Sequence, residues 1–578
     1  MENKKIGDIF NEIADIIEIE DSKRIFEIRA YRKAALTISE LQEDVADILR
    51  RKGLVGLMEL PGIGRGLAEK IKEYVDTGRM KKYDVLKRRY PIDFTSLTKV
   101  RGLGSKRAFR LYKELGVKNM KDLKAVLKKK SIRGLEGFGE KSEEALSKGV
   151  ASVEAASGRM LLGSALPEAE SVIRKLLESK LVERAELAGS ARRMKETVGD
   201  IDILVISEKP ERAMDFATSI DEVENVIMKG PTRSTVWLKI GLSCDIRVVP
   251  RESFGAAMQY FIGNKDHNVR VRQIAIRRGY KLNEYGLFDR KGNIIESENE
   301  GDIYKILGMA YPAPEMREDR GEIELAMKNR LPAPVALKDI KGDLQMHSVY
   351  SDGANTIEEM ATAAAELGYE YIGMTDHSKT EYAARGMDET RFKKYIKEID
   401  KVNEKLNGKI HILKSAETDI LKDGSLDFGK AALDEMDYVL ASIHTNLNMD
   451  KDAMTKRLVR CIESGDVDII AHPTDRIIQQ RDPIPLDLDK VFQAAKDNNV
   501  AMEVDGYPER LDLNDENIMK AREYGLKFAI DTDSHRTHHL KLMRFGVGTA
   551  RRGWLTKSDV INTLGREQIA GFFRNRRL

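Results

Sequence analysis

The chain has very little cysteine, since only Cys244 and Cys461 occur among its 578 residues. Two cysteines cannot form the disulfide framework of a small secreted domain, so we expect a reducing, cytoplasmic environment. The sequence also lacks any apolar run of about 18 residues, the length that a membrane-spanning helix needs. Its first residues, MENKKIGDIF, show no charged-then-apolar leader of the secretory type. These absences argue against a membrane protein and a secreted protein.

The composition, with 41% hydrophobic and 33% charged residues, allows the chain to bury several cores. Its length suggests roughly four domains. The net charge is only +3, but residues 51–150 carry 26 Lys and Arg against 12 Asp and Glu, whereas residues 341–578 carry 35 against 41. The basic block indicates a polyanion partner for the first part of the chain. A solvated charged surface is the alternative, and charge alone does not decide between them.

The first 150 residues follow a helical pattern, with apolar residues at three- and four-residue spacing and no strand pattern before about residue 184. Within this region a Gly-x-Gly turn that leads into a helix occurs as LPGIGRGLAEKI, VRGLGSKRAFRL and LEGFGEKSEEAL. Such a turn exposes backbone N–H groups at a helix N-terminus and lets a phosphate approach closely. This is the helix-hairpin-helix pattern, which binds the DNA backbone without reading its sequence.

A single copy of this turn also occurs where two helices are merely joined. Three copies inside a basic block favour non-specific DNA binding. The predicted DNA-binding residues are Gly62, Gly64, Gly102, Gly104, Gly137 and Gly139.

A first chemical site is predicted in GSARRMKETVGDIDILV, residues 189–205. On a strand, Asp200 and Asp202 point to the same face, and two adjacent carboxylates repel each other unless a cation lies between them. Mg²⁺ prefers such oxygen ligands and keeps positions open for phosphates. Asp245, in the strand-like SCDIRVV, could complete a two-metal site, and Ser190 and Arg193 could hold a triphosphate. A lone Asp-x-Asp is usually a solvated strand end, but this combination is much more specific.

The segment resembles the nucleotidyltransferase palm of the family X DNA polymerases, and the resemblance extends from residue 1 to about residue 320. LPGIGRGLAEKI is similar to the hairpin of the family's lyase domain, VRGLGSKRAFRL to that of its next DNA-binding subdomain, and residues 260–288 to its nucleotide-closing subdomain.

The resemblance implies a role for each matching residue. Asp200, Asp202 and Asp245 would bind two Mg²⁺ ions, with Asp245 nearest the primer 3′-OH. The residues expected to contact the nucleotide are Ser190, Arg193, Gly199 and Arg159 at the triphosphate, Tyr260, Phe261 and Gly263 at the sugar, and Asn268 at the base edge. Arg272 would contact the template strand. Positioning and charge neutralisation are what phosphoryl transfer requires.

Lys70 matches the family's Schiff-base lysine, which removes a 5′-deoxyribose phosphate. The chain departs from the family's pattern nearby: Glu27 stands where the 5′-phosphate pocket has basic residues, and Gly66 replaces a second lysine. A plain surface lysine is therefore the alternative.

A second chemical site is predicted from the histidines, eight of which follow residue 340. Several apolar, strand-like runs are each followed by a histidine, aspartate or glutamate, the residue types that bind metal ions, and helical stretches separate the runs. That pattern is typical of a parallel β/α barrel, whose active site collects at the C-terminal ends of the strands. The predicted ligands are His347, Asp352, His377, Glu417, His444, His472, Asp533 and His535.

This part, residues 340–578, resembles the PHP family of metal-dependent phosphoesterases. The resemblance implies up to three metal ions. One would be shared by His347, Glu417 and Asp533, a second by Asp352, His377 and His535, and a third by Glu417, His444 and His472. Mn²⁺ or Zn²⁺ suits such a mixed imidazole and carboxylate set.

Three positions near the predicted metal site bear on its activity. Gln345 stands where a His-x-His pair would place its first ligand, and an amide oxygen is a poorer ligand than imidazole. Asp475 stands where the family usually has a small residue and adds negative charge near the expected phosphate path. Arg481 and Arg510 are candidates to receive a phosphate, or plain salt-bridge partners.

The predicted fold class is a multidomain α+β and α/β chain. The predicted domains are a lyase-like helical domain (1–85), a DNA-binding subdomain (86–150), a palm (151–255), a nucleotide-closing thumb subdomain (256–318), a linker (319–340) and a distorted PHP β/α barrel (341–578).

The resemblances together imply a cytoplasmic, nucleoid-associated prokaryotic family X polymerase that fills short gaps in DNA repair and carries a 3′–5′ exonuclease. Cleavage at abasic sites is a further activity that the resemblance allows for the PHP domain. Its partners would be gapped or primer–template DNA and dNTPs. Two alternatives stay open: a polymerase whose PHP domain is a non-catalytic scaffold, and a PHP enzyme acting on a small phosphomonoester.

Overall fold

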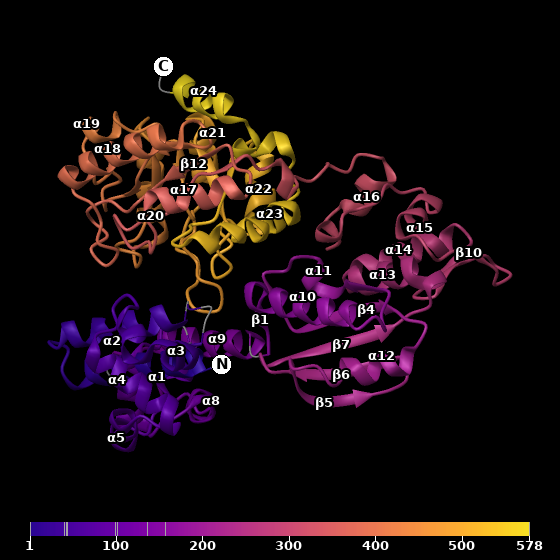
Figure 1. The fold of residues 1–578 in the computed structure, drawn as a ribbon, viewed down its shortest axis with the longest axis horizontal. Helices are drawn as coiled ribbons and strands as arrows, with labels where there is room; N and C mark the ends of the chain where they lie inside the picture. Colours follow the sequence, from indigo (N-terminus) through magenta and orange to yellow (C-terminus); the bar gives the residue numbers. More distant parts are fainter. Residues whose placement is uncertain are drawn as a thin grey trace. The chain divides into compact units, whose positions relative to one another are not determined.

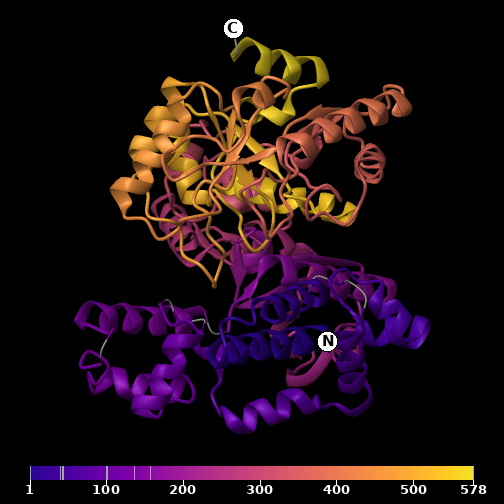
Figure 2. The ribbon, with the colours of Figure 1, turned by 90° about the vertical axis from the view of Figure 1, so that its left-hand side faces the viewer.

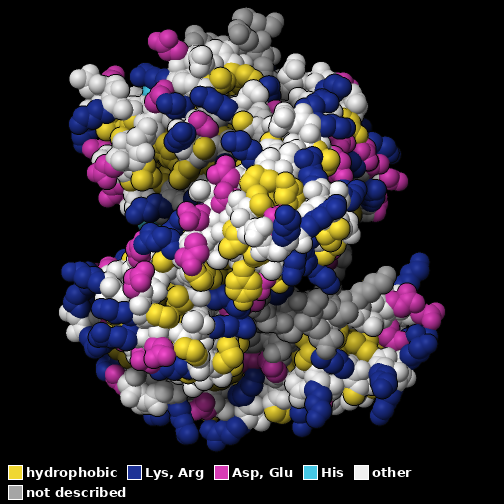
Figure 3. Space-filling model, turned by 90° about the vertical axis from the view of Figure 1, so that its right-hand side faces the viewer, with side chains coloured by type: hydrophobic (Ala, Val, Ile, Leu, Met, Phe, Trp, Pro, Cys, Tyr) yellow, Lys and Arg dark blue, Asp and Glu magenta, His cyan; other side chains and the backbone are white. Residues whose placement is uncertain are grey.

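The computed structural model describes residues 2–39, 41, 44–98, 100, 102–135, 137–156 and 158–576. The chain forms two compact units, Met1–Ser157 with Gln479–Arg481, and Gly158–Ile478 with Asp482–Leu578. Among the described helices, none is long and apolar enough to cross a membrane. Lys and Arg side chains are interspersed with Asp and Glu over the face shown in Figure 3.

The first unit is helical, as its apolar spacing predicts. Ile6, Phe10, Ile13 and Ile17 recur on one face of the first helix and are buried in the core of the unit. The helices are α1 (Glu2–Glu20), α2 (Ile25–Ser39), α3 (Val45–Met58), α4 (Arg65–Thr77), α5 (Lys81–Arg89), α6 (Phe94–Leu97), α7 (Ser105–Leu115), α8 (Met120–Lys128) and α9 (Glu140–Ala156).

The three Gly-x-Gly turns have the same backbone conformation. Gly62, Gly102 and Gly137 each have φ of 79°, a left-handed value that glycine adopts without steric cost. Gly64 and Gly104 are the N-caps of α4 and α7, and no atom lies within 4 Å of a Cβ built at either of them. The helix N-termini are therefore open to a close approach by a ligand.

The second unit begins with a five-stranded sheet of order β2-β4-β7-β6-β5, in which β4 and β7 are parallel. Helix α12 packs beside β6 and β7, and Figure 1 shows β5, β6 and β7 side by side. The elements are β1 (Met160–Leu161), α10 (Leu162–Glu178), β2 (Arg184–Leu187), α11 (Gly189–Arg192), β3 (Thr197–Val198), β4 (Asp200–Ile206), α12 (Pro210–Ala217), β5 (Val223–Lys229), β6 (Arg233–Leu238) and β7 (Leu242–Val248). Strand β1 lies before residue 184, where the sequence shows no strand pattern, because its two residues are too few to form one.

A smaller region with the three-stranded sheet β10-β9-β8 follows. Its elements are η1 (Arg251–Ser253), α13 (Phe254–Ile262), α14 (Lys265–Arg277), β8 (Lys281–Asn283), β9 (Gly286–Phe288), β10 (Ile294–Glu296), α15 (Glu300–Ile306), η2 (Pro314–Met316), α16 (Glu322–Met327) and η3 (Leu337–Asp339). The predicted linker is ordered, because the fully buried Glu322 lies 2.7 Å from Nδ1 of His267, whose Nε2 lies 2.9 Å from the Tyr304 hydroxyl. His267 is therefore a structural histidine.

The C-terminal part is the predicted β/α barrel. Two parallel sheets, β11-β12-β13 and β14-β15-β16-β17-β18, are joined by the bridges Met346–Ser534 and His377–Glu417, which close the ring of strands. Figure 2 shows the orange and yellow helices around these strands.

The elements of the barrel alternate along the chain. They are β11 (Gly342–Asp343), α17 (Ile357–Glu366), β12 (Tyr371–Met374), α18 (Glu389–Leu406), β13 (His411–Lys414), β14 (Glu417–Asp419), α19 (Lys430–Leu433), β15 (Leu440–Ser442), α20 (Lys451–Glu463), β16 (Ile469–Ile470), α21 (Leu488–Asp497), β17 (Ala501–Asp505), α22 (Asp515–Glu523), β18 (Phe528–Asp531), η4 (Thr537–Leu542), α23 (Met543–Arg552), η5 (Lys557–Asp559), η6 (Ile561–Thr563) and α24 (Arg566–Arg576).

Candidate functional site

The three predicted carboxylates of the palm lie on the two parallel strands β4 and β7. Asp200 and Asp202 are two residues apart on β4, and Asp202 pairs directly with Asp245 on β7. Burial raises the pKa of Asp202 to about 7, and the charges of Asp200 and Asp245 add to the effect. A carboxyl group that loses its proton only near neutral pH marks a place where positive charge is missing.

A tight turn brings the start of α11 against Asp202. Gly189 has φ of 62°, and a Cβ at this position would lie 2.1 Å from Asp202 Oδ2. Only glycine fits so close an approach, which explains the Gly-Ser at this point of the sequence. The hydroxyl of Ser190, the next residue, is buried and has no hydrogen-bond partner among the described residues. It is available to a ligand at the carboxylates.

The carboxylate of Asp245 accepts hydrogen bonds from two side chains of the neighbouring strand β6. Arg233 Nη2 donates to Asp245 Oδ2 at 2.6 Å, and the Thr235 hydroxyl donates to Oδ1. Among the described residues, the palm carboxylates do not form a set of three ligand atoms within 4.8 Å of one another. Arg233 could not be identified from the sequence, because its contact with Asp245 depends on the pairing register of β6 and β7.

Arg193 lies at the edge of this carboxylate group. Its Nε donates to Glu318 Oε1 at 3.0 Å and its Nη1 donates to the Ile262 carbonyl. Its charge also lowers the pKa of Asp202, although burial and the two acidic neighbours prevail. Arg159, the other basic residue predicted at the triphosphate, donates from Nε to the Thr197 hydroxyl at 3.0 Å. Gly199 follows β3 and lies close to Arg159, since a Cβ built there would be 3.5 Å from Arg159 Nη1.

The predicted sugar and base contacts lie at the end of α13 and the start of α14. The rings of Tyr260 and Phe261 meet edge to face, with centroids 5.0 Å apart. A Cβ on Gly263 would lie 2.6 Å from Asn268 Oδ1, so the glycine is required by this packing. Asn268 Nδ2 donates to the Tyr260 carbonyl at 2.6 Å, and Arg272 Nε donates to the Asn268 carbonyl at 3.2 Å. The structure thus brings these residues together in one segment.

Lys70 lies in the helical unit with an exposed side chain that donates to the Gly66 carbonyl at 2.9 Å. Glu27 accepts hydrogen bonds from Arg24 Nε at 3.0 Å and from Lys82 Nζ at 2.6 Å. Two nearby cations are thereby already paired with a carboxylate. The surface-lysine alternative describes this geometry, and the lyase role of Lys70 stays a prediction.

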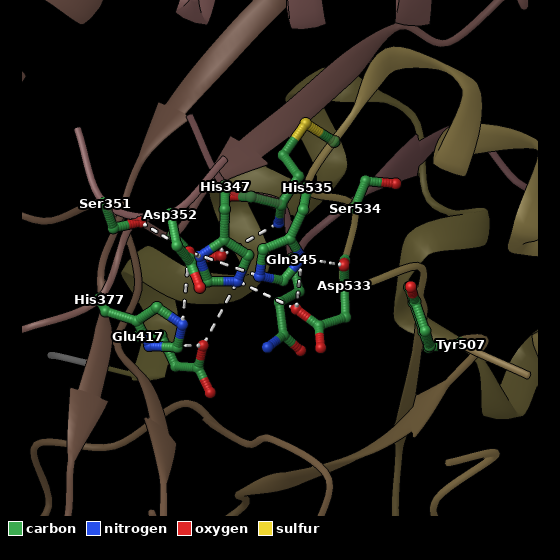
Figure 4. Close-up of polar contacts among 12 residues, drawn as sticks. Gln345, His347, Ser351, Asp352, His377, Glu417, Tyr507, Asp533, Ser534 and His535 are labelled. Atoms are coloured by element: carbon green, nitrogen blue, oxygen red, sulfur yellow. Dashed lines mark hydrogen bonds and ion pairs between the residues drawn. The ribbon is translucent and has the colours of Figure 1, made fainter. Parts of the chain in front are cut away.

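The barrel brings its predicted ligands together at the C-terminal ends of the strands. Figure 4 shows six of them, His347, Asp352, His377, Glu417, Asp533 and His535. Three sets of side chains have ligand atoms within 4.8 Å of one another. They are His347, Asp352, His377 and His535; His377, Glu417 and His444; and His347, Glu417 and Asp533. The last set is the one predicted for the first metal. The predicted third set differs, because His377 rather than His472 groups with Glu417 and His444.

Glu417 belongs to two of these three sets and lies beside four histidine rings. Its Oε2 lies 3.4 Å from His347 Nε2 and 3.3 Å from His377 Nδ1. Its Oε1 lies 3.2 Å from His444 Nε2 and 2.8 Å from His472 Nε2. Burial raises the pKa of Glu417, but the facing His377 and His444 outweigh it and hold the pKa well below its usual range. The carboxylate is therefore charged and ready to bind a cation.

The donor set fits divalent metal ions. His347 is fully buried, and neither of its ring nitrogens has a well-aligned hydrogen bond among the described residues. The same is true of Nδ1 of His377. Buried polar atoms are normally hydrogen-bonded, so such nitrogens indicate a ligand. His444 is oriented by a carboxylate behind it, with Asp419 Oδ1 3.3 Å from its Nδ1, as is typical of metal-binding histidines. Imidazole and carboxylate together suit Mn²⁺ or Zn²⁺.

Gln345 and Asp475, the two departures from the family's pattern, have partners of their own. When the side-chain amide of Gln345 is oriented so that its oxygen and nitrogen both have hydrogen-bond partners, its nitrogen donates to Glu503 Oε2 at 3.0 Å. Asp475 Oδ1 accepts from Arg510 Nη1 at 2.8 Å. Gln345 is therefore bound to a neighbouring carboxylate, and Arg510 is engaged in a salt bridge. Glu503 was not identified from the sequence, because a glutamate within a buried strand has no distinctive spacing.

Replacing the shared carboxylate tests whether these side chains bind metal. Glu417→Gln removes the charge that four histidines face, so we expect the Mn²⁺ or Zn²⁺ content per chain to fall by at least one ion. The content is measured by plasma mass spectrometry after dialysis. His411→Gln, at the opposite end of a strand, serves as the control and should keep the wild-type content. Equal metal content in wild type and Glu417→Gln would refute this assignment.

Four segments of the chain match known protein families. Residues 1–80 match the helix-hairpin-helix domain, 94–151 the SAM-like helix-hairpin-helix tandem, 257–318 the DNA polymerase beta thumb, and 343–506 the PHP domain. These matches agree with the helical, thumb and barrel regions of the predicted fold class.

Three relatives are also similar in sequence. DNA polymerase/3′-5′ exonuclease PolX of Bacillus subtilis (strain 168) is 36% identical over 577 residues, which cover 99% of this chain and 100% of that protein. A probable phosphatase of Thermoanaerobacter sp. (strain X514) is 29% identical over 232 residues, 38% of this chain and 89% of the phosphatase. DNA polymerase lambda of Rattus norvegicus is 25% identical over 289 residues, 45% of this chain and 48% of that protein. The full-length match, together with the thumb, helix-hairpin-helix and PHP segments, shows that the chain belongs to the family X DNA polymerases that carry a C-terminal PHP domain.

Proposed function

We propose that the chain is a DNA-templated DNA polymerase that fills short gaps during DNA repair, and that its barrel is a metal-dependent 3′–5′ exonuclease. The observation that carries the polymerase activity is the pairing of Asp202 with Asp245 across β4 and β7, with Asp200 on the same face. The observation that carries the nuclease activity is the cluster of ligand atoms around Glu417, in which buried histidine nitrogens lack a well-aligned hydrogen bond among the described residues. Gapped or primer–template DNA and dNTPs are the proposed substrates.

In the polymerase site, Asp200, Asp202 and Asp245 would hold Mg²⁺. Bound Mg²⁺ neutralises phosphate charge and makes the primer hydroxyl easier to ionise. The chain itself supplies the orienting groups. The unpartnered Ser190 hydroxyl can donate to a phosphate oxygen, and the Arg193 guanidinium beside the carboxylates balances the charge of the triphosphate. Tyr260 and Phe261 would pack against the sugar of the incoming nucleotide.

In the barrel, the proposed ligands would hold Mn²⁺ or Zn²⁺, up to three ions. Such ions lower the pKa of a bound water so that hydroxide forms near neutral pH. Glu417 keeps its negative charge there because His377 and His444 hold its pKa low. Asp419 fixes the orientation of the His444 ring. The strand ends of the barrel thus present a rigid set of ligands toward a phosphodiester.

A second candidate activity of the barrel is hydrolysis of a small phosphomonoester. The similarity to probable phosphatases favours it. The full-length similarity to a polymerase with exonuclease activity and the helix-hairpin-helix turns favour DNA as the substrate. Release of phosphate from a small ester with no shortening of DNA would favour the phosphomonoester.

Two substitutions separate the proposed activities on a labelled primer–template. We expect Asp202→Ala to lower nucleotide addition at least a hundredfold and to leave primer shortening by the barrel unchanged. His444→Ala should do the reverse. Addition is measured with Mg²⁺ and dNTPs, and shortening with Mn²⁺ alone.

The controls for this pair are Asp221→Ala, at an exposed palm carboxylate, and His411→Gln. Both should keep both activities. Template-dependent addition that survives Asp202→Ala would contradict the polymerase site, and shortening that survives His444→Ala would contradict the nuclease site.

The raised pKa of Asp202 makes Mg²⁺ binding depend on pH. Below pH 7 the carboxyl group holds a proton in the metal-free protein, so a cation must displace it. We therefore expect the Mg²⁺ concentration for half-maximal nucleotide addition to rise as the pH falls from 7 to 6, and to level off above pH 8. Asp202→Glu, a longer carboxylate in another position, should shift this profile. A half-maximal concentration that is constant between pH 6 and 8 would contradict the site's electrostatics.

A further inference from the structure

A side chain of the barrel contacts the palm turn that carries Arg193. Arg552, the last residue of α23, donates from Nη1 to the backbone carbonyl of Arg193 at 2.9 Å. The same Nη1 donates to Glu318 Oε1 at 3.0 Å, and Arg193 Nε donates to that same oxygen at 3.0 Å. One carboxylate oxygen is thus shared between an arginine of the palm and an arginine of the barrel.

Arg193 and Arg552 are buried, and Glu318 between them is ionised. Only 8% of Arg193 and 6% of Arg552 is exposed. Burial raises the pKa of Glu318, but Arg552, Arg193 and Lys195 outweigh it and lower the pKa to about 2. Glu318 is therefore ionised at any working pH, and a buried charge of this kind must keep its partners.

The remaining contacts of Arg552 fix it in place. Its Nη2 donates to Asp515 Oδ2 at 2.6 Å, and Arg320 Nη1 donates to the same oxygen at 3.1 Å. Close packing supports this contact, because a Cβ on Gly548 of α23 would lie 2.6 Å from Met194 Cε. Met194, directly after Arg193, has φ of 54°, which a non-glycine residue adopts only when its surroundings impose it.

These contacts leave one nitrogen of the Arg193 guanidinium, Nη2, available to a ligand. Nε is bound to Glu318 and Nη1 to the Ile262 carbonyl, while Nη2 has no hydrogen bond among the described residues. Glu318 fixes the plane of the guanidinium, and Arg552 fixes both Glu318 and the backbone of Arg193. The guanidinium is therefore held in one orientation while Nη2 keeps its hydrogen atoms available, and an oriented donor binds phosphate better than a mobile one.

We propose that Arg552, a residue of the PHP barrel, is a positioning residue for the triphosphate site of the polymerase, acting through Glu318 on Arg193. The barrel is then a structural part of the nucleotide site as well as a separate nuclease. This inference rests on the proposed polymerase function and on the role proposed for Arg193.

The test compares Arg552→Met with wild type in the full-length protein on a gapped DNA. Arg552→Met keeps the length of the side chain and removes its donors. We expect the KM for dNTP and the inhibition constant of pyrophosphate, which binds through the triphosphate contacts, to rise together at least fivefold. The kcat, the affinity for gapped DNA and the nuclease rate should stay within twofold, and Arg552→Lys should recover part of the loss.

Arg544→Ala is the matched control. Arg544 lies on the same helix and also binds the palm, with Nη1 2.9 Å from each carboxylate oxygen of Glu170, but this pair is more exposed than the pair of Arg552 and Glu318. It should leave both constants unchanged.

The outcomes separate the possible failures. An unchanged KM for dNTP and pyrophosphate constant in folded Arg552→Met overturns the inference, and so does a uniform loss that includes the nuclease rate. If Arg552→Met does not fold, Glu318→Gln decides in the same way, since it keeps the shape and removes the shared charge. A wild-type protein that adds no nucleotide on a template overturns the proposed polymerase function instead.

Discussion

The charge balance around Glu417 is the interaction on which the barrel depends. A fully buried carboxylate is costly unless positive charge surrounds it, and four histidine rings face this one within 3.4 Å. Nδ1 of His347 and Nδ1 of His472 have no hydrogen bond among the described residues, so the protein alone does not satisfy these buried groups. Divalent cations would satisfy the carboxylate and the rings together. The strand ends, the buried ligands and the proposed hydrolytic chemistry all follow from this requirement.

The palm site also lacks positive charge, but its predicted metal ligands are all carboxylates. Asp202 pairs with Asp245 on the neighbouring parallel strand; burial raises the pKa of Asp202 to about 7, and the charges of Asp200 and Asp245 add to this effect. Arg233 forms an ion pair with Asp245, and the charge of Arg193 lowers the pKa of Asp202, so both arginines balance part of the negative charge. In both sites the charges of the protein groups alone are unbalanced, and bound cations would balance them. They differ in ligand type, which suits Mg²⁺ in the palm and softer ions in the barrel.

Much of both sites could be predicted from the sequence, because short-range periodicity determines which residues share a strand face. Asp200 and Asp202 had to point the same way, and ligands such as His377 and His444 follow recognisable apolar strands. Contacts between distant segments could not be predicted. Arg233 meets Asp245 only in one strand register, Gln345 meets Glu503 of the distant strand β17, and Arg552 meets Glu318 across 234 positions. The pairing of Arg510 with Asp475 likewise has no local signal.

The most direct test of this account is an anomalous-scattering measurement at the manganese edge on crystals of the protein grown with Mn²⁺. The account predicts strong peaks within bonding distance of Glu417, one toward His377 and His444 and one toward His347 and Asp533. A well-ordered Glu417 cluster without such a peak, in protein that still shortens DNA 3′ ends, would contradict it.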